Sequence, residues 1–270
     1  MITKKTIKVP PKALPNFDKP PVNEVVCGMR FETPNGLMIP HIGLLWEKFR
    51  SEYPNIQHAS PIFSDPTRIE DMTTGIPLPR VWFINNDDNQ LIQFQFDRFY
   101  YNWRRRQDIY PRYPNVIRNF ESCFNKINLF FKENALGEII PLELELSYIN
   151  HIPQGEGWNT IEDIMKLLVD FPRKQIKARF LPSPIKTSWM SVFQLPDGNG
   201  HLTINVKQAL RTADKIPIII LELISRRPCE GMTEYKDIRK WYDLAREWIV
   251  KGFTDVTSQK IQKNIWKLEK

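Results

Sequence analysis

Two neighbouring apolar patterns with different periods constrain the fold of this chain most strongly. Between residues 116 and 131, apolar side chains recur every three or four residues, which is the period of one helix face. They are Val116, Phe120, Cys123, Phe124, Ile127, Phe130 and Phe131. Shortly afterwards Leu142, Leu144, Leu146 and Tyr148 alternate with Glu143, Glu145 and Ser147, as in a strand with one solvated face. An amphipathic helix followed by such a strand predicts a sheet covered by helices.

The same two periods continue along the rest of the chain. Further strands are predicted at 22–32, 81–84 and 91–103, with a bulge or bend near Asp97 and Arg98 where the aromatic phase switches. The last third is predicted to be a β-meander with strands at 176–181, 189–195, 202–210 and 218–226. Connections this short favour antiparallel pairing.

Helices are expected at 42–53, from Thr160 onwards, and at 238–249, where Gly252 is the expected stop. A short helix capped by Thr257 follows, and residues 54–79 are predicted to be an irregular connection. The resulting order predicts an α+β fold, an antiparallel sheet packed with amphipathic helices. It allows two pseudo-equivalent halves, 22–152 and 153–270.

The composition indicates one compact unit over residues 22–270, because 41% of the chain is hydrophobic and 12% is aromatic. Residues 1–21 hold five prolines and five lysines, so an extended and poorly packed N-terminal arm is expected. The three cysteines are odd in number and far apart, which favours reduced thiols in a cytoplasmic protein. Pro217 and Glu222 interrupt the longest apolar run, so no membrane span is expected.

A basic aromatic segment is the strongest candidate for a binding site. Six arginines and one aspartate lie between Arg98 and Arg118, and aromatic rings are interleaved with them. The candidate ligand-binding residues are Trp103, Arg104, Arg105, Arg106, Tyr110, Arg112 and Tyr113. Guanidinium groups can pair with phosphates while rings stack on bases, so nucleic acid or another polyanion is a candidate partner. In the alternative, the rings pack inward and the arginines form a solvated or ion-paired surface.

Other polar groups carry weaker signals. Glu143 and Glu145 share one strand face and can hold a metal, although their alternation predicts that they face water. His151 can line a pocket beside the loop 155–158, where Trp158 either moves over a ligand or packs on the next helix. Cys229 follows two arginines that can lower its pKa, and the alternative is an ordinary surface thiol. Tyr148 and Asn150 are candidates for the same pocket as His151.

Motifs for cofactor or metal chemistry are missing from the sequence. The four histidines have no paired spacing, and no glycine-rich phosphate loop, GxSxG or HExxH motif occurs. No cofactor and no metal are therefore predicted.

Six blocks carry a family resemblance. They are PPVNEVVCGMRF (20–31), HIGLLWEKFRSEYP (41–54), PRVWFIN (79–85), NWRRR with YPRYP (102–114), SYINHI (147–152) and AREWIVKGFTDVT (245–257). In this order they resemble a sporadically distributed family of uncharacterised prokaryotic proteins. The resemblance implies no reaction, ligand or catalytic residue. A patchy distribution implies an accessory gene, such as a defence or toxin–antitoxin component.

The sequence favours a non-enzymatic binding or regulatory protein that recognises an anionic ligand or a protein encoded nearby. One alternative is an enzyme acting on nucleic acid or nucleotides, with a site built from scattered side chains. Another is a homo-oligomeric subunit assembled through aromatic surface, and the sequence leaves the oligomeric state open.

Overall fold

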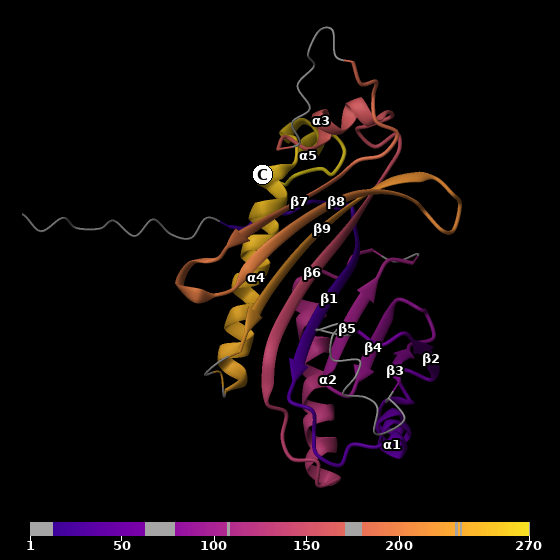
Figure 1. The fold of residues 1–270 in the computed structure, drawn as a ribbon, viewed down its shortest axis with the longest axis vertical. Coiled ribbons are helices and arrows are strands. Elements are labelled where there is room, and N and C mark those ends of the chain that lie inside the picture. The colour runs from indigo at the N-terminus through magenta and orange to yellow at the C-terminus, as the bar shows by residue number, and fades with distance from the viewer. Residues whose placement is uncertain are drawn as a thin grey trace, which may run out of the picture.

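One antiparallel sheet organises the protein. The computed structural model describes residues 13–62, 79–106, 109–170, 180–229, 232 and 234–269. Among these residues nine strands join in the order β2-β3-β4-β5-β1-β6-β9-β8-β7 (Figure 1). Their bounds are β1 Val22–Phe31, β2 Asn55–Ala59, β3 Arg80–Ile84, β4 Gln90–Gln95, β5 Arg98–Arg104, β6 Pro141–Pro153, β7 Ser188–Gln194, β8 His201–Leu210 and β9 Pro217–Pro228. The predicted antiparallel sheet is confirmed.

The two long helices cover the same face of this sheet. The helices are α1 Ile39–Phe49, α2 Tyr113–Glu133, α3 Ile164–Leu167, α4 Tyr235–Val256 and α5 Gln259–Asn264. Helix α2 contacts β5 and β1, whereas α4 contacts β9, β6 and β8 (Figure 1). The predicted α+β class, a sheet packed with amphipathic helices, is therefore confirmed.

No helix among the described residues is long and apolar enough to cross a membrane.

Aromatic rings connect the sheet to both long helices. Phe99 on β5 stacks on Phe120 of α2 with ring centroids 5.2 Å apart. Phe120 in turn meets Tyr242 of α4 at 5.0 Å, and Phe120 and Tyr242 are both fully buried. The helical stripe predicted from residue 116 onwards faces this core, because Phe124 and Ile127 are also buried. Burial of these rings supplies much of the apolar area that holds the layers together.

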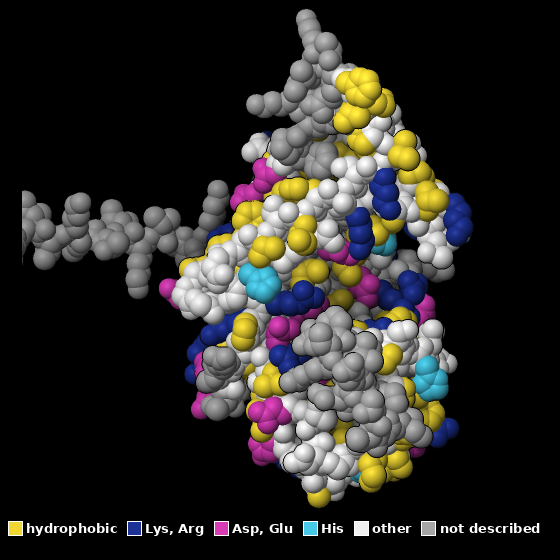
Figure 2. Space-filling view, viewed as in Figure 1, with side chains coloured by type: hydrophobic (Ala, Val, Ile, Leu, Met, Phe, Trp, Pro, Cys, Tyr) yellow, Lys and Arg dark blue, Asp and Glu magenta, His cyan; other side chains and the backbone are white. Residues whose placement is uncertain are grey.

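The other face of the sheet, called here the polar face, carries a hydrogen-bonded side-chain network. Asn102 donates to Glu24 over 2.6 Å and accepts from Gln93 over 2.9 Å. Figure 2 looks onto this face: charged side chains of both signs lie across its middle. Gly28 is required here, since a Cβ at that position would lie 2.1 Å from Cδ1 of Tyr100. The Tyr100 ring therefore lies directly across the backbone of β1.

Two local expectations are wrong for clear geometric reasons. The segment 91–103 is a hairpin and not one bulged strand, since Phe94 pairs with Phe99 across a turn at residues 96–97. This reversal explains the switch in aromatic phase, because both rings then point to the helix-covered side. The connection predicted at 54–79 contains strand β2, which pairs with β3, while residues 63–78 lie outside the described part.

The last long helix and the helix predicted at Thr160 also differ from expectation, and the first meander strand is mostly undescribed. Gly252 does not stop α4, which continues to Val256. A Cβ at Gly252 would lie 3.0 Å from Cδ2 of Leu202, so the glycine lets α4 approach β8 closely. At Thr160 the predicted capping box forms, but only a 3-10 turn and the one-turn α3 follow it. The strand predicted at 176–181 lies mostly outside the described residues.

Part of the N-terminal arm is packed on the core. Residues 15–21, called here the strap, include Phe17, which is only 6% exposed. Its ring centroid lies 5.5 Å from that of Phe253 and 6.4 Å from that of Trp266. Poor packing was expected because prolines and lysines dominate the arm, but this single aromatic ring provides enough apolar surface to bury. Residues 1–12 lie outside the described part.

Strand β6 joins the two segments proposed as halves. It pairs with β1 on one side and with β9 on the other, so the sheet is continuous across residue 152. The pseudo-equivalence of the halves stays a prediction.

Candidate functional site

A cleft of about 670 Å³ opens where the strap crosses the end of the sheet. Several parts of the chain line it: the strap with the start of β1, the β5–α2 connection, the end of β6 with the loop after it, the β8–β9 loop and the residues after α5. Its charged side chains are Asp18, Lys19, Arg105, Arg112, Glu156 and Arg211. Among the lining residues that the structure describes, four bases against two acids give an excess of positive charge, which favours anions.

Arg105 positions the strap at one wall of the cleft. Its Nε donates to the carbonyl oxygen of Val22 over 2.9 Å, and its Nη2 donates to that of Pro20 over 3.1 Å. Burial lowers the pKa of Arg105, and the nearby carboxylate of Glu156 partly opposes this shift. A guanidinium group that serves two backbone carbonyls fixes where the strap turns into β1.

His151 and Glu156 lie in the same partly buried, positively charged environment. Burial lowers the pKa of His151, and the cations Arg211 and Lys207 lower it further, against the opposing effect of Glu222. Burial raises the pKa of Glu156, while Arg105 and Arg211 oppose the rise. Both shifts disfavour the charged forms of these groups, and an anion bound beside His151 would raise the pKa of His151 again.

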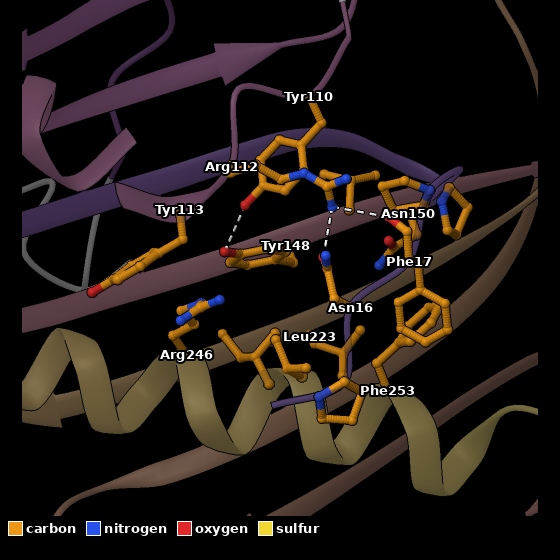
Figure 3. A pocket seen from close by; sticks show the side chains of 16 residues that line it. Asn16, Phe17, Tyr110, Arg112, Tyr113, Tyr148, Asn150, Leu223, Arg246 and Phe253 are labelled. Atoms are coloured by element: carbon orange, nitrogen blue, oxygen red, sulfur yellow. Dashed lines mark hydrogen bonds between the residues drawn. The ribbon is translucent and has the colours of Figure 1, made fainter. Parts of the chain in front are cut away.

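Arg112 connects the cleft to a smaller cavity of about 70 Å³ between the strap, β6 and α4 (Figure 3). Its Nη1 donates to Oδ1 of Asn16 over 2.8 Å and to the carbonyl oxygen of Phe17 over 2.9 Å. The backbone of Arg112 has φ 68° and ψ 152°, a conformation that residues other than glycine rarely adopt. Such a conformation costs on the order of 1–3 kcal/mol, and the two bonds to the strap help to hold it.

Tyrosines line the inner wall of the smaller cavity. The hydroxyl groups of Tyr110 and Tyr148 are 2.9 Å apart, and Tyr110 also lies beside Trp103 with ring centroids 5.3 Å apart (Figure 3). Asn150 lines this cavity and donates to a β9 backbone carbonyl. Tyr148 and Asn150 thus face the smaller cavity, whereas His151 faces the larger cleft.

The structure separates the seven residues of the basic aromatic segment into three groups. Arg105, Tyr110 and Arg112 line the cleft. Arg104 and Arg106 both pair with Asp88 in the β3–β4 turn. Trp103 and Tyr113 belong to the core, where the Tyr113 hydroxyl donates to Asp243 over 2.8 Å.

This division changes the role that the segment can have. The rings of Trp103, Tyr110 and Tyr113 are at most 8% exposed. The prediction that these rings offer a surface on which bases stack is therefore wrong. Burial alone would raise the pKa of Asp88, but its bonds to Arg106 and Arg104 outweigh burial and lower it. The alternative of inward-packed rings and ion-paired arginines describes this part of the segment.

The weaker candidates are used structurally. Trp158 is buried and donates from Nε1 to the carbonyl oxygen of Ile152 over 3.0 Å. Glu145 accepts from Arg226 over 2.8 Å and from Ser147 over 2.7 Å, so it is not simply solvated. Cys229 is buried and not a surface thiol, and burial raises its pKa to about 12. Over the described residues, no cluster of three or more potential metal ligands occurs.

Sequence reasoning did not identify Lys19 and Arg211 as part of the site. Each lies in a segment whose local pattern is that of a polar loop, and only the tertiary fold brings them to Arg105. Ile109 at the mouth of the cleft was also missed, although it is 82% exposed. An isolated exposed isoleucine has no signature in a single sequence.

Comparisons with protein-family models, curated proteins and solved structures find no match to this chain. The site is therefore interpreted from its own chemistry.

Proposed function

We propose that this chain is a non-enzymatic binding protein whose cleft captures a small organic anion. The observation that carries the proposal is the excess of basic side chains around a space of about 670 Å³. This volume lies within the range of about 300–1,000 Å³ that is typical of small-molecule sites. Lys19 and Arg211 belong to this lining, and Arg211 also forms an ion pair with Asp214.

The apolar part of the lining supports an organic ligand over a simple inorganic ion. Ile109, Ile265 and Trp266 lie on the same cleft as the arginines. A molecule with an anionic group and an apolar or flat body, of about nucleotide size, would satisfy both kinds of surface.

The charged groups support capture and not turnover. Arginine and lysine hold anions by charge and hydrogen bonds without exchanging protons near neutral pH. His151 can exchange protons in this range, but burial and neighbouring cations disfavour its charged form. A role in an accessory prokaryotic system rests on the family resemblance alone, and a cytoplasmic location rests on the cysteine pattern.

Calorimetric titration with a panel of nucleoside monophosphates, sugar phosphates and tricarboxylates tests this proposal. The test variant is Lys19→Gln with Arg211→Gln. The matched control is Lys48→Gln with Arg50→Gln, which likewise removes one lysine and one arginine charge, here from exposed ion pairs at the end of α1. We expect wild type and control to bind a panel member equally, and the test variant to bind it at least about tenfold more weakly.

Three results would contradict the proposal. The first is that no panel member binds the wild type, and the second is that the test variant binds as tightly as the control. Conversion of a bound panel member to product would favour the alternative enzyme.

A further inference from the structure

Strand β7 is an edge strand with no charged side chain. It ends the sheet beside β8, and no strand among the described residues pairs with its outer side (Figure 1). The sequence Ser188–Gln194 contains no Lys, Arg, Asp, Glu or Pro. Soluble proteins usually protect an edge strand with such residues, because its free backbone groups can bind another strand. An edge of seven residues that is unpaired by the described part of the chain and carries no charged side chain therefore indicates an interface.

The hairpin between β7 and β8 fixes which backbone groups of β7 point outwards. Leu195 donates its N–H to the carbonyl oxygen of Gly200 over 2.9 Å, which makes this a hydrogen-bonded pair. Hydrogen-bonded and non-hydrogen-bonded pairs alternate along an antiparallel ladder. The backbone groups of Phe193, Ser191 and Trp189 therefore face β8. Those of the residues between them, Ser188, Met190, Val192 and Gln194, face outwards.

The outer side chains of β7 are apolar on both faces of the strand. Met190 and Val192 pair with Asn205 and Thr203 of β8 and lie on the polar face, where they are 65% and 59% exposed. Trp189 and Phe193 alternate with them and lie on the helix-covered side. Exposed apolar side chains on both faces of an edge are a liability unless a partner covers them.

We infer that β7 pairs with β7 of a second copy of this chain, antiparallel, around a two-fold axis at Ser191. In this register Met190 lies opposite Val192 of the second copy, and Trp189 lies opposite Phe193. Both pairs are apolar with apolar. Ser188 lies opposite Gln194, which pairs polar with polar.

The register also lets the outward-facing backbone groups of β7 form hydrogen bonds. Met190 and Val192 both point their N–H and C=O groups outwards, so each such pair across the axis can exchange two hydrogen bonds. A shift by one residue would place an outward-facing residue opposite an inward-facing one and would lose these bonds. The same segment is thus complementary to itself in side chains and in backbone, as a two-fold interface requires.

A groove beside the edge offers room for the side chains of the second copy. It has a volume of about 400 Å³, and its lining combines Phe193 and Ile204 of the sheet and Trp248 of α4 with the charged side chains of Asp170, Glu247, Lys251 and Asp255. The second copy's Trp189, opposite Phe193, would reach this groove.

Light scattering after size-exclusion chromatography tests the interface on the full chain. We expect wild type at twice the 32.0 kDa of one chain. Val192→Lys should give the mass of one chain with an unchanged circular dichroism spectrum, because the exposed side chain contributes little to the fold. Ile56→Lys is the matched control on the opposite edge strand β2, where Ile56 is 47% exposed, and it should remain dimeric. A monomeric wild type would overturn the inference and leave a strand of another protein as the occupant.

Cysteine cross-linking tests the register. Two Ser191 residues would face each other as a non-hydrogen-bonded pair with Cα atoms about 4.5 Å apart, within disulfide range. Two Met190 residues would lie about 8 Å apart, beyond that range. The native cysteines are all buried, so they do not compete with the introduced cysteine for cross-linking. We expect Ser191→Cys to form disulfide-linked dimers at least about tenfold faster than Met190→Cys. Equal rates, or faster linkage through Met190→Cys, would overturn the register.

Discussion

Replacing Phe17 by alanine tests whether the strap is part of the folded core. The ring is buried and makes edge contacts with Phe253 and Trp266. Truncation of a buried phenylalanine costs about 3–5 kcal/mol when the site cannot collapse. The strap is held at its ends by Arg105 and Arg112, so it can relax only partly towards the gap. We therefore expect a loss of about 3 kcal/mol in the free energy of unfolding.

Urea unfolding followed by circular dichroism measures this loss. With a slope of about 3 kcal/mol per molar urea, the midpoint should fall by about 1 M. The matched control is Phe180→Ala, because Phe180 is 98% exposed and the same change should leave the midpoint in place. Equal midpoints for wild type and Phe17→Ala would refute docking of the strap. An equal drop in both variants would refute the burial argument.

Three further predictions concern the cleft and the polar face. Arg105→Gln removes two hydrogen bonds from a cationic donor to backbone carbonyls and should lower the free energy of unfolding by about 2 kcal/mol in urea titration. Gly28→Ala should cost about 2 kcal/mol because its Cβ meets the Tyr100 ring, and a double-mutant cycle with Tyr100→Ala should recover most of it. The folded pKa of His151 is lowered by burial and by Arg211, so the unfolded chain takes up this proton first as the pH falls. Stability should therefore decline from about pH 6.5 down through the folded pKa, and His151→Gln should reduce that slope.

Much of the fold follows from local patterns in the sequence. The stripe that includes Phe120 and Phe124 predicts a buried helix face, and the alternation through Leu144 and Leu146 predicts the inner strand β6. Local patterns fail where the identity of a residue is set by packing against a neighbour that is far away in sequence. Gly252 resembles a helix stop, but it is there to let α4 approach β8.

The site follows from the sequence only in part. Arg105, Tyr110 and Arg112 belong to one basic aromatic segment, so charge and ring density point to them. The same density does not reveal that the tyrosine ring is buried or that both arginines hold the strap. Lys19 and Arg211 reach the cleft from polar segments about 190 residues apart, and no local signal connects them.

The contact of Phe17 with Trp266 also sets the earliest point in protein synthesis at which the cleft can be completed. A ribosome adds about 5–20 residues per second, so Trp266 is made roughly 12 to 50 seconds after Phe17. Until then the strap lacks one of the two rings it packs on, and the cleft lacks the wall that Trp266 provides. A ligand that binds in this cleft therefore stabilises only chains that have been synthesised past Trp266.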